Sequence, residues 1–239
     1  MKYPADAVVF ARCRVLSLTL ALMCGVASNA LAKNTLRVPE DFADVQSAVD
    51  AAVDGDQVRI GPGRYCSYMI IINKRIELIG EGDAVICGTP FLHPREQIAV
   101  RANGTVLRHL TIDAGTETGN GQLARSIRAI FFTSVDNVVI EDNVILGAYV
   151  GILGFGNGVT ISHNRIEGSS EAVMEVRGDD STILSNDVSG TGVGIHADGA
   201  GLVITKNTIA VTSAAIEVPS PCLDCVVVKN VVSQSGTPR

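Results

Sequence analysis

A short phrase built around a central asparagine recurs along the second half of the chain, and it constrains the fold more than any other feature. Its copies are Ile140–Ile145 (IEDNVI), Ile161–Ile166 (ISHNRI), Ile183–Val188 (ILSNDV), Ile204–Ile209 (ITKNTI) and Val227–Val232 (VVKNVV). The central residues are Asn143, Asn164, Asn186, Asn207 and Asn230, which are 21, 22, 21 and 23 residues apart. A nearly fixed period of this length indicates a stack of repeated units.

A period near 22 residues fits one coil of a parallel β-helix. The segments between the asparagines are rich in Val and Ile and are punctuated by Gly, Asn, Asp and Ser, as expected for short strands joined by tight turns. A leucine-rich repeat has a similar period, but the regular Leu pattern and the helical segment that it needs are absent. Coils stack at ~4.8 Å. The Val and Ile residues should therefore form inward columns, and the asparagines should form a hydrogen-bonded ladder.

Composition agrees with a narrow, stacked interior. Aromatic residues make up 4% of the 239 residues, Trp is absent, and there are 24 glycines. Such an interior takes Val, Ile, Ala and Asn, while its turns take Gly. The scarcity of aromatic side chains also argues against the aromatic platforms on which many glycan-binding proteins rely.

The first 32 residues have the features of an export signal. These are a positive start (Lys2, Arg12, Arg14), a nine-residue apolar run (Val15–Met23) and a small-x-small cleavage pattern (Ala30–Ala32). We predict a signal peptide at 1–32 and a periplasmic or secreted protein, since the apolar run is too short to span a membrane. The alternative is a lipoprotein signal ending at Cys24, although the preceding Leu-Met pair fits it poorly.

Removal of this signal makes the chain more acidic. It leaves 207 residues (239 − 32), with 16 Lys and Arg (19 − 3) and 24 Asp and Glu (25 − 1), so the formal charge changes from −6 to −8. An acidic exported protein is a poor partner for nucleic acid or anionic membranes. At one period per coil, 207 residues suffice for about eight coils after a capping helix.

Four cysteines remain after the signal, which predicts two disulfides in an exported chain but allows three connectivities. Cys66 and Cys87 are 21 residues apart, which is one coil, so stacking brings their backbones within disulfide reach. We therefore favour Cys66–Cys87 and Cys222–Cys225. The alternative, a redox or metal role for the C-L-D-C motif, lacks a second Cys or His pair at ligand spacing.

The remaining segments suggest how the two ends of the β-helix are treated. Apolar residues recur at helical spacing from Phe42 to Val53, so we predict an amphipathic helix over about 43–54 that ends near Gly55. Such a helix would cover the open strand edges at the N-terminal end of a single domain, 33–239. The sequence after Val232 contains no comparable helix, so either the last short coil shields itself or a partner covers this end, and we expect self-association through it.

Two motifs resemble a known family. The repeated I-x-x-N-x-I phrase and the opening segment Val45–Tyr65 (VQSAVDAAVDGDQVRIGPGRY) resemble the pectate-lyase-like superfamily of right-handed parallel β-helices, and specifically the NosD-type periplasmic proteins. The likeness covers nearly all of 35–233 and implies the fold. It also implies two functional classes. Enzymes of the superfamily hold substrate along the outward face of one sheet, whereas NosD-type proteins are accessory proteins associated with copper-enzyme maturation.

Candidate site residues follow from aligning the strands that precede the asparagine phrases on Gly156, Gly178 and Gly199. Met174, Val176, Ile195 and Ala197 then point inward. The outward residues, our candidate catalytic set, are Glu175, Arg177, His196 and Asp198. Glu175 should stack against His196, and Arg177 against Asp198. Candidate substrate-binding residues are Phe155, Arg95 and Glu217, of which Arg95 lies in one of two long turns, 89–97 and 113–125.

A carboxylate beside an imidazole can perform general acid–base chemistry, and Arg can hold a uronate. We therefore predict that the protein binds or modifies a polysaccharide, by lyase or epimerase rather than glycoside hydrolase chemistry, because no convincing pair of carboxylates is present. Asp179-Asp180 and His196 resemble parts of polygalacturonase motifs, but the R-I-K triplet is missing. The alternatives are a solvated charge ladder on a non-catalytic NosD-like accessory protein and a structural or adhesive module.

No cofactor or resident metal is expected. The alternative is calcium bound by Asp179, Asp180 and Asp198, although aspartates in turns commonly serve as turn formers.

Overall fold

The computed structural model describes residues 33–88, 96–115, 127–219 and 221–234. The predicted signal peptide, Arg95 and most of the two long turns lie outside these ranges, so the predictions made for them stay predictions. Among the described residues, no helical segment has the length and hydrophobicity needed to cross a bilayer.

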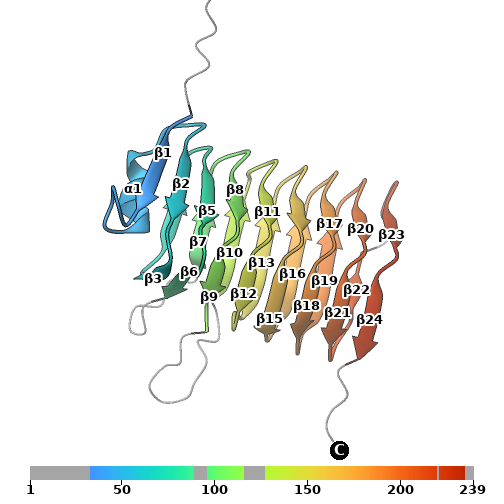
Figure 1. The fold of residues 1–239 in the computed structure, drawn as a ribbon. Coiled ribbons are helices and arrows are strands. Elements are labelled where there is room, and N and C mark those ends of the chain that lie inside the picture. Colours follow the sequence, from blue (N-terminus) through green and yellow to red (C-terminus); the bar gives the residue numbers. More distant parts are fainter. Residues whose placement is uncertain (1–32, 89–95, 116–126, 220, 235–239) are drawn as a thin grey trace, which may run out of the picture. The chain divides into compact units, whose positions relative to one another are not determined.

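The strands form three sheets, each built from one strand per coil (Figure 1). Sheet A contains β1 (Thr35–Val38), β2 (Gln57–Ile60), β5 (Glu77–Gly80), β8 (Val106–Arg108), β11 (Val139–Glu141), β14 (Thr160–Ser162), β17 (Thr182–Leu184), β20 (Val203–Thr205) and β23 (Val226–Val228). Sheet B contains β3 (Gly63–Ser67), β6 (Ala84–Gly88), β9 (Thr111–Asp113), β12 (Val144–Leu146), β15 (Arg165–Ser169), β18 (Asp187–Gly190), β21 (Thr208–Val211) and β24 (Val231–Gln234). Sheet C contains β4 (Ile70–Ile72), β7 (Glu96–Val100), β10 (Arg128–Thr133), β13 (Val150–Phe155), β16 (Ala172–Arg177), β19 (Val193–Asp198) and β22 (Ile216–Glu217).

Neighbouring strands in each sheet belong to successive coils and run parallel, for example β16 with β19 and β17 with β20. The chain passes from sheet C to sheet A to sheet B and back, so each coil adds one layer to the stack. This confirms the prediction of a right-handed parallel β-helix of about eight coils.

The interior consists of aligned apolar columns. One column on sheet C runs through Ile98, Ile130, Ile152, Met174 and Ile195, all fully buried, as the alignment predicts for Met174 and Ile195. The β-branched residues favour extended backbone and fill the narrow cross-section, and their burial removes apolar area from water at about 25 cal/mol per Å².

The asparagine ladder lies at the turn between sheets A and B. Asn164 shows its geometry: its Oδ1 accepts from the backbone N–H and the side-chain amide of Asn143, each at 3.0 Å. Its own backbone and side-chain N–H groups donate to Asn186 Oδ1, at 2.9 and 3.0 Å. The same pattern continues through Asn207 to Asn230. Each coil thereby satisfies buried polar groups of its neighbour, which fixes the register of the stack.

A second polar ladder, which was not predicted from the sequence, lies in the turns that come after the strands of sheet C. Each side-chain Oδ1 accepts from the backbone N–H of the equivalent residue in the next coil, at 2.7–2.9 Å. The accepting side chains are those of Asn103, Asp136, Asn157 and Asp179. The ladder ends at Ala200, which donates its backbone N–H to Asp179. Asp179 is therefore a turn former, since its Oδ1 receives the N–H of Ala200 at 2.8 Å.

Helix α1 (Val45–Ala51) is shorter than the predicted 43–54. Asp44 caps its N-terminus by accepting the N–H of Ser47 at 2.9 Å. The helix ends before Gly55 because Ala52 is already extended and Asp56 Oδ2 captures the next backbone N–H, that of Val53, at 2.9 Å.

Helix α1 lies against β1, β2 and β4 at the N-terminal end of the stack (Figure 1). The amide of Gln46 pairs with the backbone of Ile71 in the edge strand β4, donating to its carbonyl at 3.2 Å and accepting its N–H at 2.8 Å. The side chain thus replaces the missing strand neighbour, which is the capping role expected of this helix.

The opposite end of the described stack exposes apolar side chains. They are Leu223, Val226, Val227, Val228, Val231 and Val232, each more than two-fifths exposed. This surface is consistent with association through that end, which stays a prediction.

Candidate functional site

The outward face of sheet C carries the predicted site. Residues in register on successive strands form columns across the coils, and one column runs Phe131, Leu153, Glu175, His196 and Glu217. A neighbouring column runs Thr133, Phe155, Arg177 and Asp198. The predicted register of Glu175 with His196 and of Arg177 with Asp198 is therefore the observed one. We call these two columns the sheet C strip.

The first half of the strip is apolar. Leu153 is only 7% exposed although it points outward, and it belongs to a small cluster with Val150 and Ala172. Phe131, Tyr149 and Phe155 pack around this cluster. Guanidinium groups lie over two of the rings, Arg128 at 5.2 Å from the centroid of Phe131 and Arg177 at 5.6 Å from that of Phe155.

The second half of the strip is charged, and its contacts differ from those expected. Arg177 forms an ion pair with Glu175 on its own strand, with Nη2 and Oε1 2.7 Å apart, rather than with Asp198. His196 Nδ1 lies 3.1 Å from Glu217 Oε2 in the next coil rather than against Glu175. Asp198 is exposed at the end of β19.

A shallow cavity of about 200 Å³ opens in this charged half. It is lined by Glu171, Ala172, Glu175, Arg177, Val193 and His196. Hydrogen bonding to Glu171 raises the pKa of Tyr149, and desolvation and the carboxylate charge act in the same direction.

The arrangement can move a proton. In the tautomer in which Nδ1 of His196 carries the hydrogen and donates a hydrogen bond to Glu217, the other ring nitrogen, Nε2, can accept a proton. Glu175 lies beside it in the same column, held by Arg177. An imidazole oriented by one carboxylate and facing a second is a suitable general acid–base group.

Phe155 of the apolar half was predicted from the sequence, but Leu153 and the pair of Tyr149 and Glu171 were not. A signal was present for Leu153, because it occupies an outward position in the same alignment as Glu175. No periodic signal marks Tyr149 and Glu171, since both lie before the strands that the alignment compared.

The described residues contain no group of three or more His, Cys, Asp or Glu side chains placed to hold one metal ion. Asp179 and Asp180 lie in the turn after β16, where Asp180 adopts a left-handed backbone with φ of 56°. Both aspartates therefore have a role in the turn, and calcium binding there stays an untested alternative.

Solved structures share this fold. The pectin methylesterase from Aspergillus niger aligns with a TM-score of 0.59 over 86% of each chain at 12% identity. The Agl-KA catalytic domain aligns at 0.55 over 82% of this chain and 46% of its own, at 16% identity. The rice weevil pectin methyl esterase aligns at 0.54 over 84% and 89%, at 14% identity. At such identities the likeness establishes the fold alone.

The search of curated proteins finds no match for this chain. A family model does match, that of "Periplasmic copper-binding protein (NosD)", over residues 49–236. The match spans most of the chain and the whole repeat, and it agrees with the β-helix of stacked coils, so the chain belongs to the NosD family.

Proposed function

We propose that this protein binds a polysaccharide along the sheet C strip. The observation that carries the proposal is the continuity of the strip, in which an outward apolar surface passes directly into a charged cavity across successive coils. Sugar rings offer apolar faces and polar edges. The rings of Phe131 and Phe155 suit the former, and the side chains of Glu175, Arg177 and His196 suit the latter.

The charged side chains around the cavity restrict the class of polysaccharide that we expect it to bind. Arg177 is the cation that lines the cavity, and it can hold one carboxylate. Glu171, Glu175 and Glu217 lie around it and repel a chain that is charged at every residue. We therefore expect a polysaccharide in which uronate residues alternate with neutral sugars, rather than a polyuronate.

Modification of the bound sugar is the finer part of the proposal. His196, oriented by Glu217, would take a proton from a bound uronate while Arg177 neutralises its carboxylate. This division of roles is that of a lyase or epimerase, both of which begin by removing a proton next to a carboxylate.

The test is a binding and product assay with the purified protein and a panel of neutral, alternating and fully charged polysaccharides. The double variant Glu175→Ala, His196→Ala should weaken binding at least tenfold and leave the melting temperature within about 3 °C of wild type. Glu141→Ala on sheet A removes the same net charge from another face and should leave binding unchanged. Absence of binding across the panel, or a loss of stability in place of binding, would overturn the proposal.

The family description supports a second candidate, a non-catalytic periplasmic accessory protein that handles copper. The sheet C strip does not fit copper, because it holds a single histidine and no sulfur donor. Cu(I) prefers thiolate and thioether ligands. Two methionines lie among the described residues, Met69 and Met174, and Met174 is fully buried. One partly exposed thioether cannot form a site alone, so the cysteines form the donor set that fits. Copper content of the purified protein, measured after incubation with Cu(I) under reducing conditions, tests this candidate. A metal-free protein would exclude it.

A further inference from the structure

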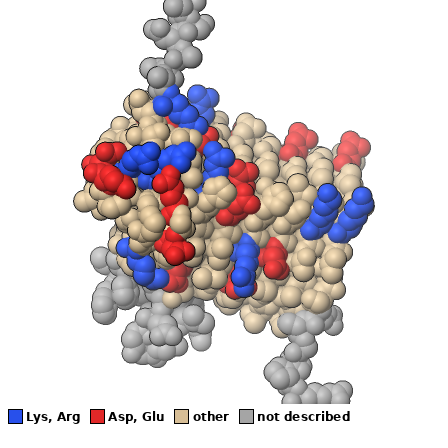
Figure 2. Space-filling model, viewed as in Figure 1, with Lys and Arg blue, Asp and Glu red and all other residues tan. Residues whose placement is uncertain are grey.

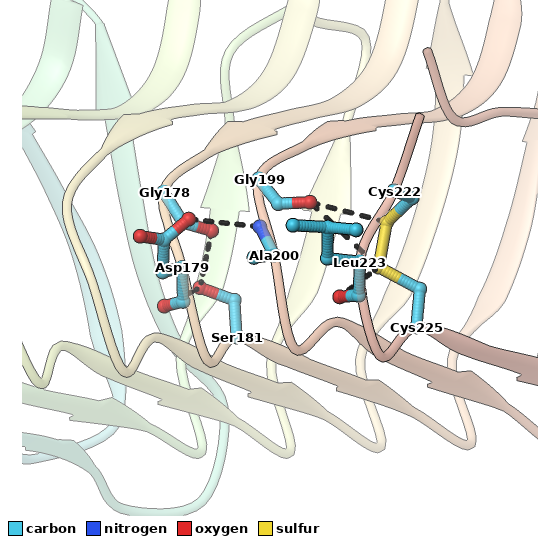
Figure 3. Close-up of a disulfide and its surroundings, with 8 residues drawn as sticks. All are labelled: Gly178, Asp179, Ser181, Gly199, Ala200, Cys222, Leu223 and Cys225. Atoms are coloured by element: carbon cyan, nitrogen blue, oxygen red, sulfur yellow. Dashed lines mark hydrogen bonds between the residues drawn. A yellow bond between two sulfur atoms is a disulfide. The ribbon is translucent and has the colours of Figure 1, made fainter. Parts of the chain in front are cut away.

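The disulfide Cys222–Cys225 lies in the turn between β22 and β23, with its two Cα atoms 5.7 Å apart. Register pairing places this turn directly over those of the two preceding coils (Figure 3). The positions equivalent to the two cysteines are Gly178 and Ser181 in one coil and Gly199 and Leu202 in the next.

The turn therefore does not require a disulfide. Asp224 has the left-handed backbone that Asp180 and Gly201 have at the same place, with φ of 56°, 56° and 65°. Backbone bonds already join it to the coil below, from the N–H of Gly201 to the carbonyl of Leu223 at 2.8 Å and from the N–H of Val226 to the carbonyl of Leu202 at 2.7 Å. The preceding coils form the same turn without sulfur.

The second disulfide of the protein is of a different kind. Cys66–Cys87 joins residues 21 positions apart on adjacent strands of sheet B, where Cys66 is exposed and Cys87 is only 2% exposed. Cys222–Cys225 spans three positions, so it removes less entropy from the unfolded chain. Both of its cysteines are half-buried at the surface beside the exposed Leu223, so a reductant can approach the bond from either cysteine, whereas the Cys87 side of Cys66–Cys87 is closed to solvent.

We propose that Cys222 and Cys225 form a reducible pair that, as a dithiol, binds one Cu(I) ion. A dithiol reductant would supply two electrons and two protons: its thiolate attacks one sulfur, a mixed disulfide forms, and its second thiol releases the protein dithiol and leaves the reductant as a disulfide. Cu(I) then displaces two protons and is held by two thiolates. This inference rests on the second candidate function and gives it a site.

The donor set selects the ion. Thiolates are soft ligands that favour Cu(I), whereas Zn²⁺ takes four ligands in protein sites. The described residues offer no third His, Cys, Asp or Glu to join this pair in a metal-binding group. The carbonyl oxygen of Gly199 lies 3.1 Å from Cys222 Sγ and 3.7 Å from Cys225 Sγ (Figure 3). In the reduced protein it can accept from the thiols and keep them side by side.

The first experiment titrates the full chain with a dithiol reductant and identifies reduced cysteines by alkylation and mass spectrometry. We expect Cys222 and Cys225 to be alkylated at reductant concentrations at least tenfold below those needed for Cys66 and Cys87. Simultaneous reduction of the two disulfides would overturn the reducible pair.

The second experiment measures Cu(I) binding by competition with a chromogenic chelator, without oxygen and after this selective reduction. Wild type should bind one ion per chain, and Cys222→Ser, Cys225→Ser should bind none while keeping its β-sheet circular dichroism. If the double variant binds copper as well as wild type does, the site is wrong although the copper function stands. If neither binds, both fail. Glu175→Ala, His196→Ala should bind Cu(I) normally, which separates this result from the polysaccharide proposal.

Discussion

The outward faces of sheets A and C are both built from columns of stacked residues, but they use charge differently. On sheet A, Glu77 contacts Lys33 at 2.8 Å and Arg108 at 2.7 Å, and Arg108 reaches Glu141 in the next coil at 3.3 Å. Positive and negative groups alternate over β1, β2, β5 and β8 (Figure 2). Each of these charged groups is paired with a group from another coil, so we interpret this face as an ion-pair network that holds the coils together.

Sheet C pairs its charges less completely and mixes them with apolar surface. Arg128 pairs with Glu96 across strands at 2.8 Å, but the pair of Arg177 and Glu175 runs along one strand and leaves Asp198 in solvent. Beside it lies the partly exposed ring of Phe155, which packs on the buried Leu153 and gains nothing from facing water. A face that combines apolar surface, a cavity and incompletely paired charge fits a ligand better than it fits structural support. The comparison can be tested face by face.

The largest effect is expected beneath the sheet C strip. Gly154 lies on β13 between Leu153 and Phe155, opposite Phe132 in the preceding coil, and a Cβ added there would meet the Phe132 ring at 1.9 Å. Gly154→Ala should therefore lower the free energy of unfolding by about 2–3 kcal/mol, as overpacking does, and weaken ligand binding as well. Urea denaturation measures the first effect.

A matched double variant identifies the cause. Phe132→Leu combined with Gly154→Ala should recover at least half of the lost stability, because the shorter side chain makes room for the new methyl group. No recovery would mean that Gly154 is needed for its backbone rather than for space.

The next effect is expected on sheet A and depends on pH. Burial opposes ionisation of Glu77, but hydrogen bonds from Lys33, Gln57 and Arg108 and the charge of Arg108 outweigh it and lower the pKa to about 2. Glu77→Gln should cost about 1–2 kcal/mol at pH 7, discounted for the partial exposure of the carboxylate. Because the folded pKa lies below the unfolded one, this contribution is present above about pH 4.5 and lost as the pH falls toward 2.

Melting curves of wild type and Glu77→Gln between pH 2 and pH 7 should therefore converge at the acidic end. Polysaccharide binding at pH 7 should be unaffected by this substitution. A loss of binding would mean that the two faces are not independent.

What the sequence could predict follows from the repeat. The hydrogen bonds of the asparagines from Asn143 to Asn230 could be predicted, because a stacked side-chain amide pairs with its equivalent in the next coil. The register of Glu175 with His196 came from the same periodicity. Their contacts did not, since a long side chain chooses among rotamers: Arg177 turned along its strand to Glu175, and His196 turned to Glu217. The helix end likewise depended on a side-chain choice, since Asp56 turns back to accept the backbone N–H of Val53, three residues earlier.

A smaller effect should come from the apolar half of the strip. Phe155→Ala removes an outward ring that packs on the apolar cluster and lies under Arg177. Binding should weaken about fivefold, or ~1 kcal/mol, as the loss of one aromatic contact implies. Tyr68→Ala removes an exposed aromatic side chain outside the strip and should leave affinity unchanged. Isothermal titration of both variants against the same polysaccharide tests the contrast, and equal losses would place the ligand elsewhere.

The smallest expected effect separates charge from shape at Arg177. Arg177→Lys keeps the positive charge but loses the planar group that pairs with Glu175 and lies over Phe155. Affinity should fall two- to threefold, or ~0.5 kcal/mol, whereas Arg177→Ala should fall further because the carboxylate of the sugar then has no counter-ion. The control is Arg128→Lys, at the apolar end of the strip, where the guanidinium is paired with Glu96 at 2.8 Å. If both lysine variants bind as wild type does, the strip recognises charge alone, and the flat guanidinium over the Phe155 ring is structural.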